Sequence, residues 1–165
     1  MKLAQRAYRL LVAAASSLQS PFLFVVRVYW GIQFFQSGWG KLHDIQKVVG
    51  FFTELGIPLP ALNAWLVGLA ECIGGALLIL GLGSRLIALV LSVDMIVAYA
   101  TADREALGTV FSSDPGKFFE ATPFSFLFAS LTILIFGPGK FSLDYWIERK
   151  LPQRVDGDPR STKSD

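Results

Sequence analysis

Long apolar stretches dominate the sequence and are separated by short polar segments. Four of them, residues 21–42, 62–80, 84–101 and 123–136, are rich in aliphatic and aromatic side chains. A helix needs about 20 predominantly apolar residues to cross the roughly 30 Å hydrocarbon core of a bilayer. The pattern therefore predicts an all-α protein, a bundle of four transmembrane helices with short interfacial helices.

The fourth stretch, residues 123–136, is too short to cross a bilayer by itself, because it spans roughly 21 Å at about 1.5 Å per residue. We expect its helix to begin near Pro115 with a kink at Pro123, or to resume after the turn at 137–139. Either extension would supply the missing length.

The flanking segments predict helices at the membrane surface. Residues 1–20 combine basic and apolar positions at helical spacing, which favours a cytoplasmic amphipathic helix over a cleaved signal peptide. Ser20 and Pro21 then mark the start of the first span, because serine caps helices and proline is tolerated in a first turn. An apolar stripe within residues 43–61 predicts an interfacial helix that ends at Gly56.

The chain thus divides into an N-terminal segment 1–20, a four-helix membrane domain 21–141 and a C-terminal part 142–165. This last part is expected to contain a cytoplasmic interfacial helix and, from Pro152 onward, a disordered tail. Ten of the fifteen basic residues fall on the side of the two termini, and four fall on the opposite side. By the positive-inside rule, both termini of this multi-pass protein are cytoplasmic.

Composition supports a membrane protein and excludes several other classes. Hydrophobic residues make up 53% of the 165 positions, charged residues 17%, and the mean hydropathy is +0.50. The net charge of +2 gives no reason to expect nucleic acid as a partner, and the lipid membrane is the expected one. The single cysteine, Cys72, excludes an internal disulfide and a Cys-x-x-Cys thiol relay.

Two carboxylates lie within the hairpin formed by the second and third spans. Glu71 and Asp94 are each about eleven residues from the hairpin midpoint, so antiparallel helices would place them at the same depth. Ionisable side chains within a membrane usually face the protein interior and mark a functional site. Gly68 and Gly75 share the helix face of Glu71, which would let another helix approach it closely.

Arg27 supplies a cation in the first span, on the same helix face as two glycines, Gly31 and Gly38. We expect its guanidinium to reach both carboxylates. One cation between two carboxylates leaves an excess negative charge, so one carboxyl should have a raised pKa and hold a proton. Such a cluster suits quinone-linked proton transfer, proton conduction or recognition of a polar head group. Alternatively, the charges only fix the helix register.

Few other side chains suggest chemistry. Lys41 and His43, at the outer end of the first span, can either bind an anionic group or extend to the membrane interface. His43 has no second ligand at metal spacing, so no metal site is expected. Cys72 fits a small packing residue better than a nucleophile. No phosphate loop, catalytic triad or haem-attachment motif is present, and no catalytic residue is assigned.

Several short motifs together resemble the DoxX family. They are Arg27, Gly38-x-x-Lys41, Leu55-Gly56-Ile57-Pro58, Glu71-x-x-Gly74-Gly75 and Leu80-Gly81-Leu82-Gly83-Ser84-Arg85, and the resemblance covers roughly residues 22–141. Members of the family are four-helix bundles of the bacterial inner membrane, so the resemblance implies that location here. It also implies that Arg27, Lys41, Glu71 and Arg85 are site residues, whereas Asp94 is added on the depth argument alone.

Three functional hypotheses follow. Some DoxX members are linked to quinone-associated oxidoreductase complexes, which implies an accessory subunit without an intrinsic cofactor, with quinone as the candidate ligand of Arg27, Lys41, Glu71 and Asp94. Others are associated with maturation of small secreted or metal-binding peptides, which implies a scaffold that contacts protein partners through Arg85 and the basic tail. The third hypothesis is a small-molecule or proton transporter. Glycines in the first two spans also allow a homo-oligomer.

Overall fold

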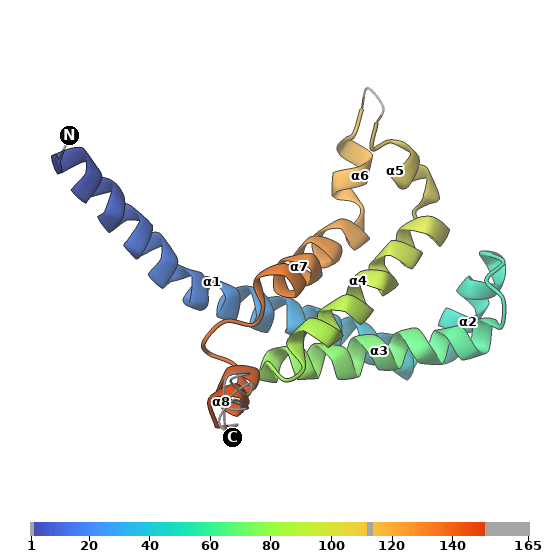
Figure 1. Ribbon diagram of the computed structural model, residues 1–165. Helices are drawn as coiled ribbons and strands as arrows, with labels where there is room; N and C mark the ends of the chain where they lie inside the picture. The colour runs from blue at the N-terminus through green and yellow to red at the C-terminus, as the bar shows by residue number, and fades with distance from the viewer. Residues whose placement is uncertain (1, 112–113, 151–165) are drawn as a thin grey trace, which may run out of the picture.

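The computed structural model describes residues 2–111 and 114–150, and every regular element within these ranges is an α-helix. In chain order the helices are α1 (Lys2–His43), α2 (Ile45–Glu54), α3 (Pro60–Leu80), α4 (Ser84–Thr101), α5 (Arg104–Gly108), α6 (Gly116–Glu120), α7 (Thr122–Phe136) and α8 (Leu143–Lys150). Helices α1, α3 and α4 are long and apolar enough to cross a membrane, and α7 is a shorter apolar helix (Figure 1). The all-α prediction is therefore confirmed, with α7 as the candidate for the fourth span.

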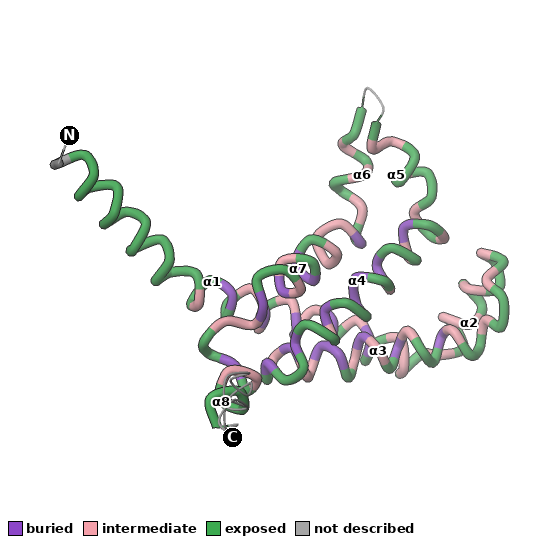
Figure 2. Tube along the Cα trace, viewed as in Figure 1, coloured by how far each residue is buried: buried purple, intermediate pink, exposed green. Residues whose placement is uncertain are grey.

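Helix α1 runs without interruption through Pro21, so the predicted start of a new helix at Ser20 is wrong. The preceding residues are rich in alanine and leucine, whose helix propensity is high, and an internal proline removes only one backbone donor. Residues 4–19 are exposed along their whole length and extend away from the other helices (Figures 1 and 2). The N-terminal segment is thus a helix, as expected, but it is continuous with the first span.

Glycines bring α1 and α3 into close antiparallel contact, as the sequence predicts. A Cβ atom added at Gly38 would clash with the backbone of Cys72, and one added at Gly75 would clash with the backbone of Phe35. Such contacts are the usual basis of helix association in membranes, where small residues let two backbones approach. The α1–α3 pair is therefore the tightly packed part of the fold, and its register decides which side chains meet.

The predicted hairpin is confirmed as α3 and α4, joined by a turn at residues 81–83. Gly81 and Gly83 have φ values of 72° and 60°, and these left-handed conformations favour glycine. Beyond the turn, α4 packs against α7, where Ser92 Oγ donates a hydrogen bond to Ser130 Oγ at 2.9 Å. A buried apolar cluster joins α1, α3, α4 and α7, and it comprises Phe34, Leu78, Ala88, Leu91, Met95 and Ile133.

The short helices α2, α5 and α6 lie at the ends of α3 and α4 that are remote from the hairpin turn (Figure 1). Helix α2 ends just before Gly56, as predicted. The helix expected to continue from Pro115 through a kink at Pro123 is instead broken into α6 and α7. The reason is the extended conformation of Ala121, whose ψ of 136° no helix can contain.

The predicted helix after residue 141 is confirmed as α8, which lies beside the hairpin turn (Figure 1). Its aromatic residue Trp146 is 63% exposed, and the interfacial position of α8 stays a prediction. The predicted disordered tail from Pro152 lies outside the described residues. The three-part domain division and the cytoplasmic position of the termini stay predictions.

Candidate functional site

A cavity of about 380 Å³ opens between α1, α2, α3, α4 and α7, on the side of the bundle remote from the hairpin turn. Most of its walls are apolar, and among these side chains are Phe51, Phe52, Leu55, Met95, Val97 and Phe126. Eight polar side chains also line it, and they are Ser37, Lys41, Asn63, Glu71, Asp94, Thr101, Asp103 and Thr122. An apolar cavity with a few convergent polar groups is the usual form of a small-molecule site.

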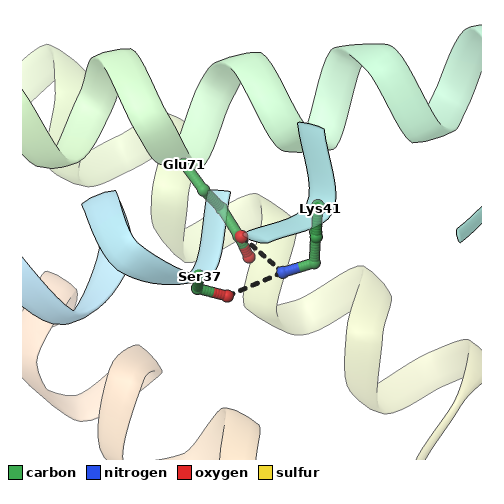
Figure 3. A network of polar contacts seen from close by, with 3 residues as sticks. All are labelled: Ser37, Lys41 and Glu71. Carbon is green, nitrogen blue, oxygen red and sulfur yellow. Dashed lines mark hydrogen bonds and ion pairs between the residues drawn. The ribbon is translucent and has the colours of Figure 1, made fainter. Parts of the chain in front are cut away.

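Lys41 and Glu71 form an ion pair across the α1–α3 interface (Figure 3). Lys41 Nζ also donates a hydrogen bond to Ser37 Oγ at 2.8 Å, one helical turn earlier on α1. The Glu71 side chain is only 3% exposed, so its charge depends on this cation. Extension of Lys41 to the membrane interface is therefore not observed, because the antiparallel packing of α1 on α3 places the ammonium group beside a buried carboxylate.

Asp94 reaches the same cavity from α4 and lies close enough to Glu71 and Lys41 to interact with both electrostatically. The prediction that the two carboxylates of the hairpin meet at one depth is confirmed. Asp94 Oδ2 is buried, and no hydrogen-bond donor among the described residues reaches it. The cluster thus contains one ammonium group, two carboxyl groups and one unsatisfied acceptor.

Arg27 lies outside this cluster, so the predicted contact of its guanidinium with Glu71 and Asp94 is wrong. Nη1 donates to the carbonyl oxygen of Pro138 at 3.4 Å, and Nη2 donates to that of Phe141 at 2.5 Å. The cause is register, since Arg27 lies ten residues before Ser37, about 15 Å farther along α1. Its guanidinium is therefore level with the hairpin turn, where a Cβ atom at Gly81 would clash with it.

Asp144 completes a link between the C-terminal segment and the hairpin turn. Its Oδ1 accepts a hydrogen bond from the backbone nitrogen of Gly83 at 2.6 Å, and its Oδ2 accepts one from Ser84 at 2.8 Å. The Asp144 backbone nitrogen donates in turn to the carbonyl of Gly81 at 2.9 Å. Arg27 and Asp144 together hold α8 against the turn, which gives Arg27 a structural role.

Replacing Arg27 by Met should therefore loosen residues 137–150 and leave the cavity unchanged. Hydrogen bonds from a charged group contribute about 1.5–3 kcal/mol, so amide hydrogen exchange there should become at least about ten-fold faster. Exchange measured by mass spectrometry in detergent checks this, with Arg104→Met as the control, since Arg104 is exposed and bonds only within its own turn. Unchanged exchange in residues 137–150 would contradict the assigned role.

The structure leaves the expectations for Arg85 and Cys72 unchanged. Arg85 is exposed at the hairpin end, beside Gly137, and its contact with a cytoplasmic partner stays a prediction. Cys72 is partly buried, and its backbone forms part of the α1–α3 contact. Within residues 2–111 and 114–150, no three His, Cys, Asp or Glu side chains gather as a metal site would require.

The sequence reasoning missed Ser37 and the aromatic walls of the cavity. The spacing of Ser37 and Lys41, four residues apart on one helix, is a usable signal for their hydrogen bond. No comparable signal exists for Phe51 and Phe52 of α2 or for Phe126 of α7, because they meet only after these helices pack around the α1–α3 pair.

Comparison with known proteins agrees with this architecture. The DoxX family model matches residues 22–104, which include all of α2, α3 and α4. The chain is 31% identical over 147 residues to the "Uncharacterized membrane protein Rv3486" of Mycobacterium tuberculosis, an alignment that covers 82% of this chain and 84% of the relative. It is 32% identical over 82 residues to the "Putative oxidoreductase CatD" of Bacillus subtilis, covering 50% of this chain and 60% of that protein.

No solved structure matches the chain. The family match spans half of the sequence, and the mycobacterial relative aligns with most of it. Both agree with the apolar helices α1, α3 and α4 in describing a membrane protein. The chain therefore belongs to the DoxX family.

Proposed function

We propose that this protein is an accessory membrane subunit of a redox system and that its cavity binds a quinone ring beside Lys41, Glu71 and Asp94. The observation that carries the proposal is the cavity itself. Its volume of about 380 Å³ lies within the range of roughly 300–1,000 Å³ that is typical of small-molecule pockets. Its walls are mainly hydrocarbon, and Lys41, Glu71 and Asp94 form a charged cluster within them, with Asp103 as a further charged residue of the lining. Such a lining suits an amphipathic ligand.

The charge balance of the cluster supports a role in proton exchange. Lys41 neutralises one carboxylate, so the second is neutral only while a proton resides on the pair of acids. An uncompensated charge is costly away from water, and a buried pair of carboxyls commonly shares one proton. Glu71 and Asp94 can therefore give a proton to a bound ligand, or receive one from it, without moving a helix.

The side chains of the cavity do not supply an electron carrier. They comprise three carboxyl groups, one amine, hydroxyl and amide groups, a thioether and hydrocarbon, none of which takes electrons from a quinol. We assign electron transfer to a protein partner that holds a redox cofactor. The name of the Bacillus relative, which calls that protein a putative oxidoreductase, favours a redox context over the other hypotheses.

The proposal is tested by blocking the cavity with a neutral side chain. Ala98 lines the cavity from α4, whereas Ala100 lies two residues away on the exposed face of the same helix. Ala98→Phe should fill the space needed by the ring, while Ala100→Phe should leave it open. We expect quinone to co-purify with the wild-type protein and with Ala100→Phe. The amount of quinone per mole of protein should be at least about ten-fold lower in Ala98→Phe.

The measurement is extraction in mild detergent from native membranes, followed by chromatography of the extracted quinones per mole of protein. Thermal unfolding of both variants shows whether each is folded. Wild-type protein without quinone, or equal quinone in two folded variants, would contradict the proposal. The lysine–carboxylate cluster would then be a structural link between helices.

A further inference from the structure

The helices around the cavity form two groups. Helices α1, α2 and α3 pack on one another, and α4 packs on α7. The α3–α4 hairpin joins the two groups at its turn, and from there α3 and α4 diverge (Figure 1). The cavity lies between the groups, near the ends of α3 and α4 that are remote from the turn. A ligand can therefore reach it only where the two groups leave a mouth.

Aromatic side chains close the side between α1 and α7. The ring of Phe126 in α7 packs edge to face on Trp30 and Phe34 of α1, with centroid distances of 5.1 and 4.7 Å. Phe34 is fully buried, and Phe126 is itself part of the cavity lining. Entry between α1 and α7 would require these packed rings to separate.

The opposite side, between α2 and α4, has a mouth instead. Phe51 of α2 and Val97 of α4 both line the cavity, and they are 48% and 49% exposed. A side chain that lines a cavity and also reaches the outer surface marks an opening. Val97 lies four residues, about 6 Å, before the end of α4, whose length of about 27 Å nearly matches the hydrocarbon core. This mouth therefore faces lipid.

A second opening lies at the far end of the cavity and is polar. Its exposed lining residues are Ala102 and Thr122. Asp103 belongs both to the cavity and to an adjoining surface hollow that is also lined by Arg104 and Lys117. Charged groups are costly to remove from water, so this end suits water and not a hydrocarbon chain.

We propose that the ligand enters the cavity sideways from the lipid, between α2 and α4, and that its apolar tail leaves between Phe51 and Val97. The inference rests on the proposed function and specifies the ligand class, a lipid-dissolved ring with a long hydrocarbon tail. Val97 follows Asp94 by three residues, so a ring beside the charged cluster lies about one helical turn from the mouth. The charged cluster recognises the ring, and the mouth accepts the tail.

The test compares one benzoquinone ring without a tail and with a decyl tail. Binding to the full-length protein in lipid nanodiscs is measured by calorimetry, and each affinity is expressed against the mole fraction of ligand in the lipid, which removes the effect of partitioning. Lipid chains are as apolar as a protein interior, so the tail gains little by moving between them. We expect the wild-type protein to bind both rings with affinities within about three-fold of each other.

A bulky side chain at the mouth should exclude the tail and not the ring. Val97→Trp should weaken binding of the decyl form at least ten-fold and that of the tailless ring less than about three-fold. Val93→Trp is the matched control, because Val93 is 52% exposed one turn earlier on α4 and does not line the cavity. It should leave both affinities unchanged. Thermal unfolding in nanodiscs shows whether each variant is folded.

Photo-crosslinking of the wild-type protein locates the tail without any substitution. A quinone with a diazirine near the ring end of its tail should label the peptides that contain Phe51 and Val97. Labelling of the peptides that contain Ala102 or Thr122 in their place would overturn the lateral route.

The outcomes separate this inference from the proposed function. Exclusion of the decyl form by the wild-type protein, or equal effects of Val97→Trp and Val93→Trp in folded protein, would overturn the lateral route and leave the ring site standing. Failure of both rings to bind the wild-type protein removes the proposed function and the inference together.

Discussion

Replacing Lys41 by Met should destabilise the membrane domain by about 3 kcal/mol. Loss of one partner from a buried ion pair typically costs about 3–5 kcal/mol, because the other charge stays buried without compensation. The lower end applies here, since the Lys41 side chain is 28% exposed whereas that of Glu71 is 3% exposed. Met occupies nearly the volume of the lysine stem, so the loss of stability results from the missing charge and not from a new cavity.

A second substitution distinguishes a charge effect from a packing effect. Glu71→Gln in the Lys41→Met background removes the uncompensated carboxylate and should recover most of the lost stability. Lys47→Met is the control, because Lys47 is an exposed lysine of α2 outside the cavity. The measurement is reversible unfolding in mixed micelles. Equal stability of Lys41→Met and Lys47→Met would show that the ion pair is not a determinant of the fold.

The sequence predicts Glu71 and Asp94 correctly because they belong to a hairpin with a short turn. When two helices run antiparallel from one turn, the rise per residue alone fixes which positions share a depth. Equal distances from the turn at residues 81–83 place both carboxyls in one layer, and the structure agrees. Local geometry therefore determines this part of the candidate site.

The sequence pattern misplaces Arg27, because Ser20 and Pro21 indicate the start of a separate helix that the structure does not have. The continuous helix α1 has no start there, so the register on α3 must come from the contacts between the two helices. Gly31 and Gly38 are seven residues apart, as are Gly68 and Gly75, and antiparallel pairing of these glycines places Arg27 near the hairpin turn. This matching spacing of glycines is present in the sequence, but it indicates the register only when the two helices are compared with each other.

The charged side chains at the two ends of the bundle consequently differ in what they contact. At the hairpin end, Arg27 and Asp144 satisfy backbone groups of the turn and of the segment before α8. At the opposite end, Lys41, Glu71 and Asp94 line a cavity and leave one oxygen unsatisfied. Arg27 Nε and Ser84 Oγ are also buried without a hydrogen-bond partner at the hairpin end, so the cavity, and not an unsatisfied polar atom, distinguishes the two ends.

A second prediction, with a larger expected effect on stability, follows from the α1–α3 register. Gly38→Ala should prevent the two helices from packing at all. The added Cβ would clash with the backbone of Cys72 and approach the carbonyl oxygen of Gly68 to 2.7 Å. Backbone atoms cannot rotate away as a side chain can, so the helices must separate along their whole contact. Overpacking of a core costs about 1–3 kcal/mol when side chains can shift, and this site should exceed that range.

Gly40→Ala is the matched control, two residues farther along α1. A Cβ at Gly40 meets no atom within 4 Å, so alanine there should stabilise the helix by about 0.5–1 kcal/mol through its higher propensity. The stability of Gly68→Ala should lie between those of Gly38→Ala and Gly40→Ala, because its Cβ meets only side-chain atoms of Leu42 and Lys41. Unfolding in mixed micelles ranks the three variants. If Gly38→Ala proves as stable as Gly40→Ala, the register that brings Lys41 to Glu71 is wrong, and the cavity described above does not form.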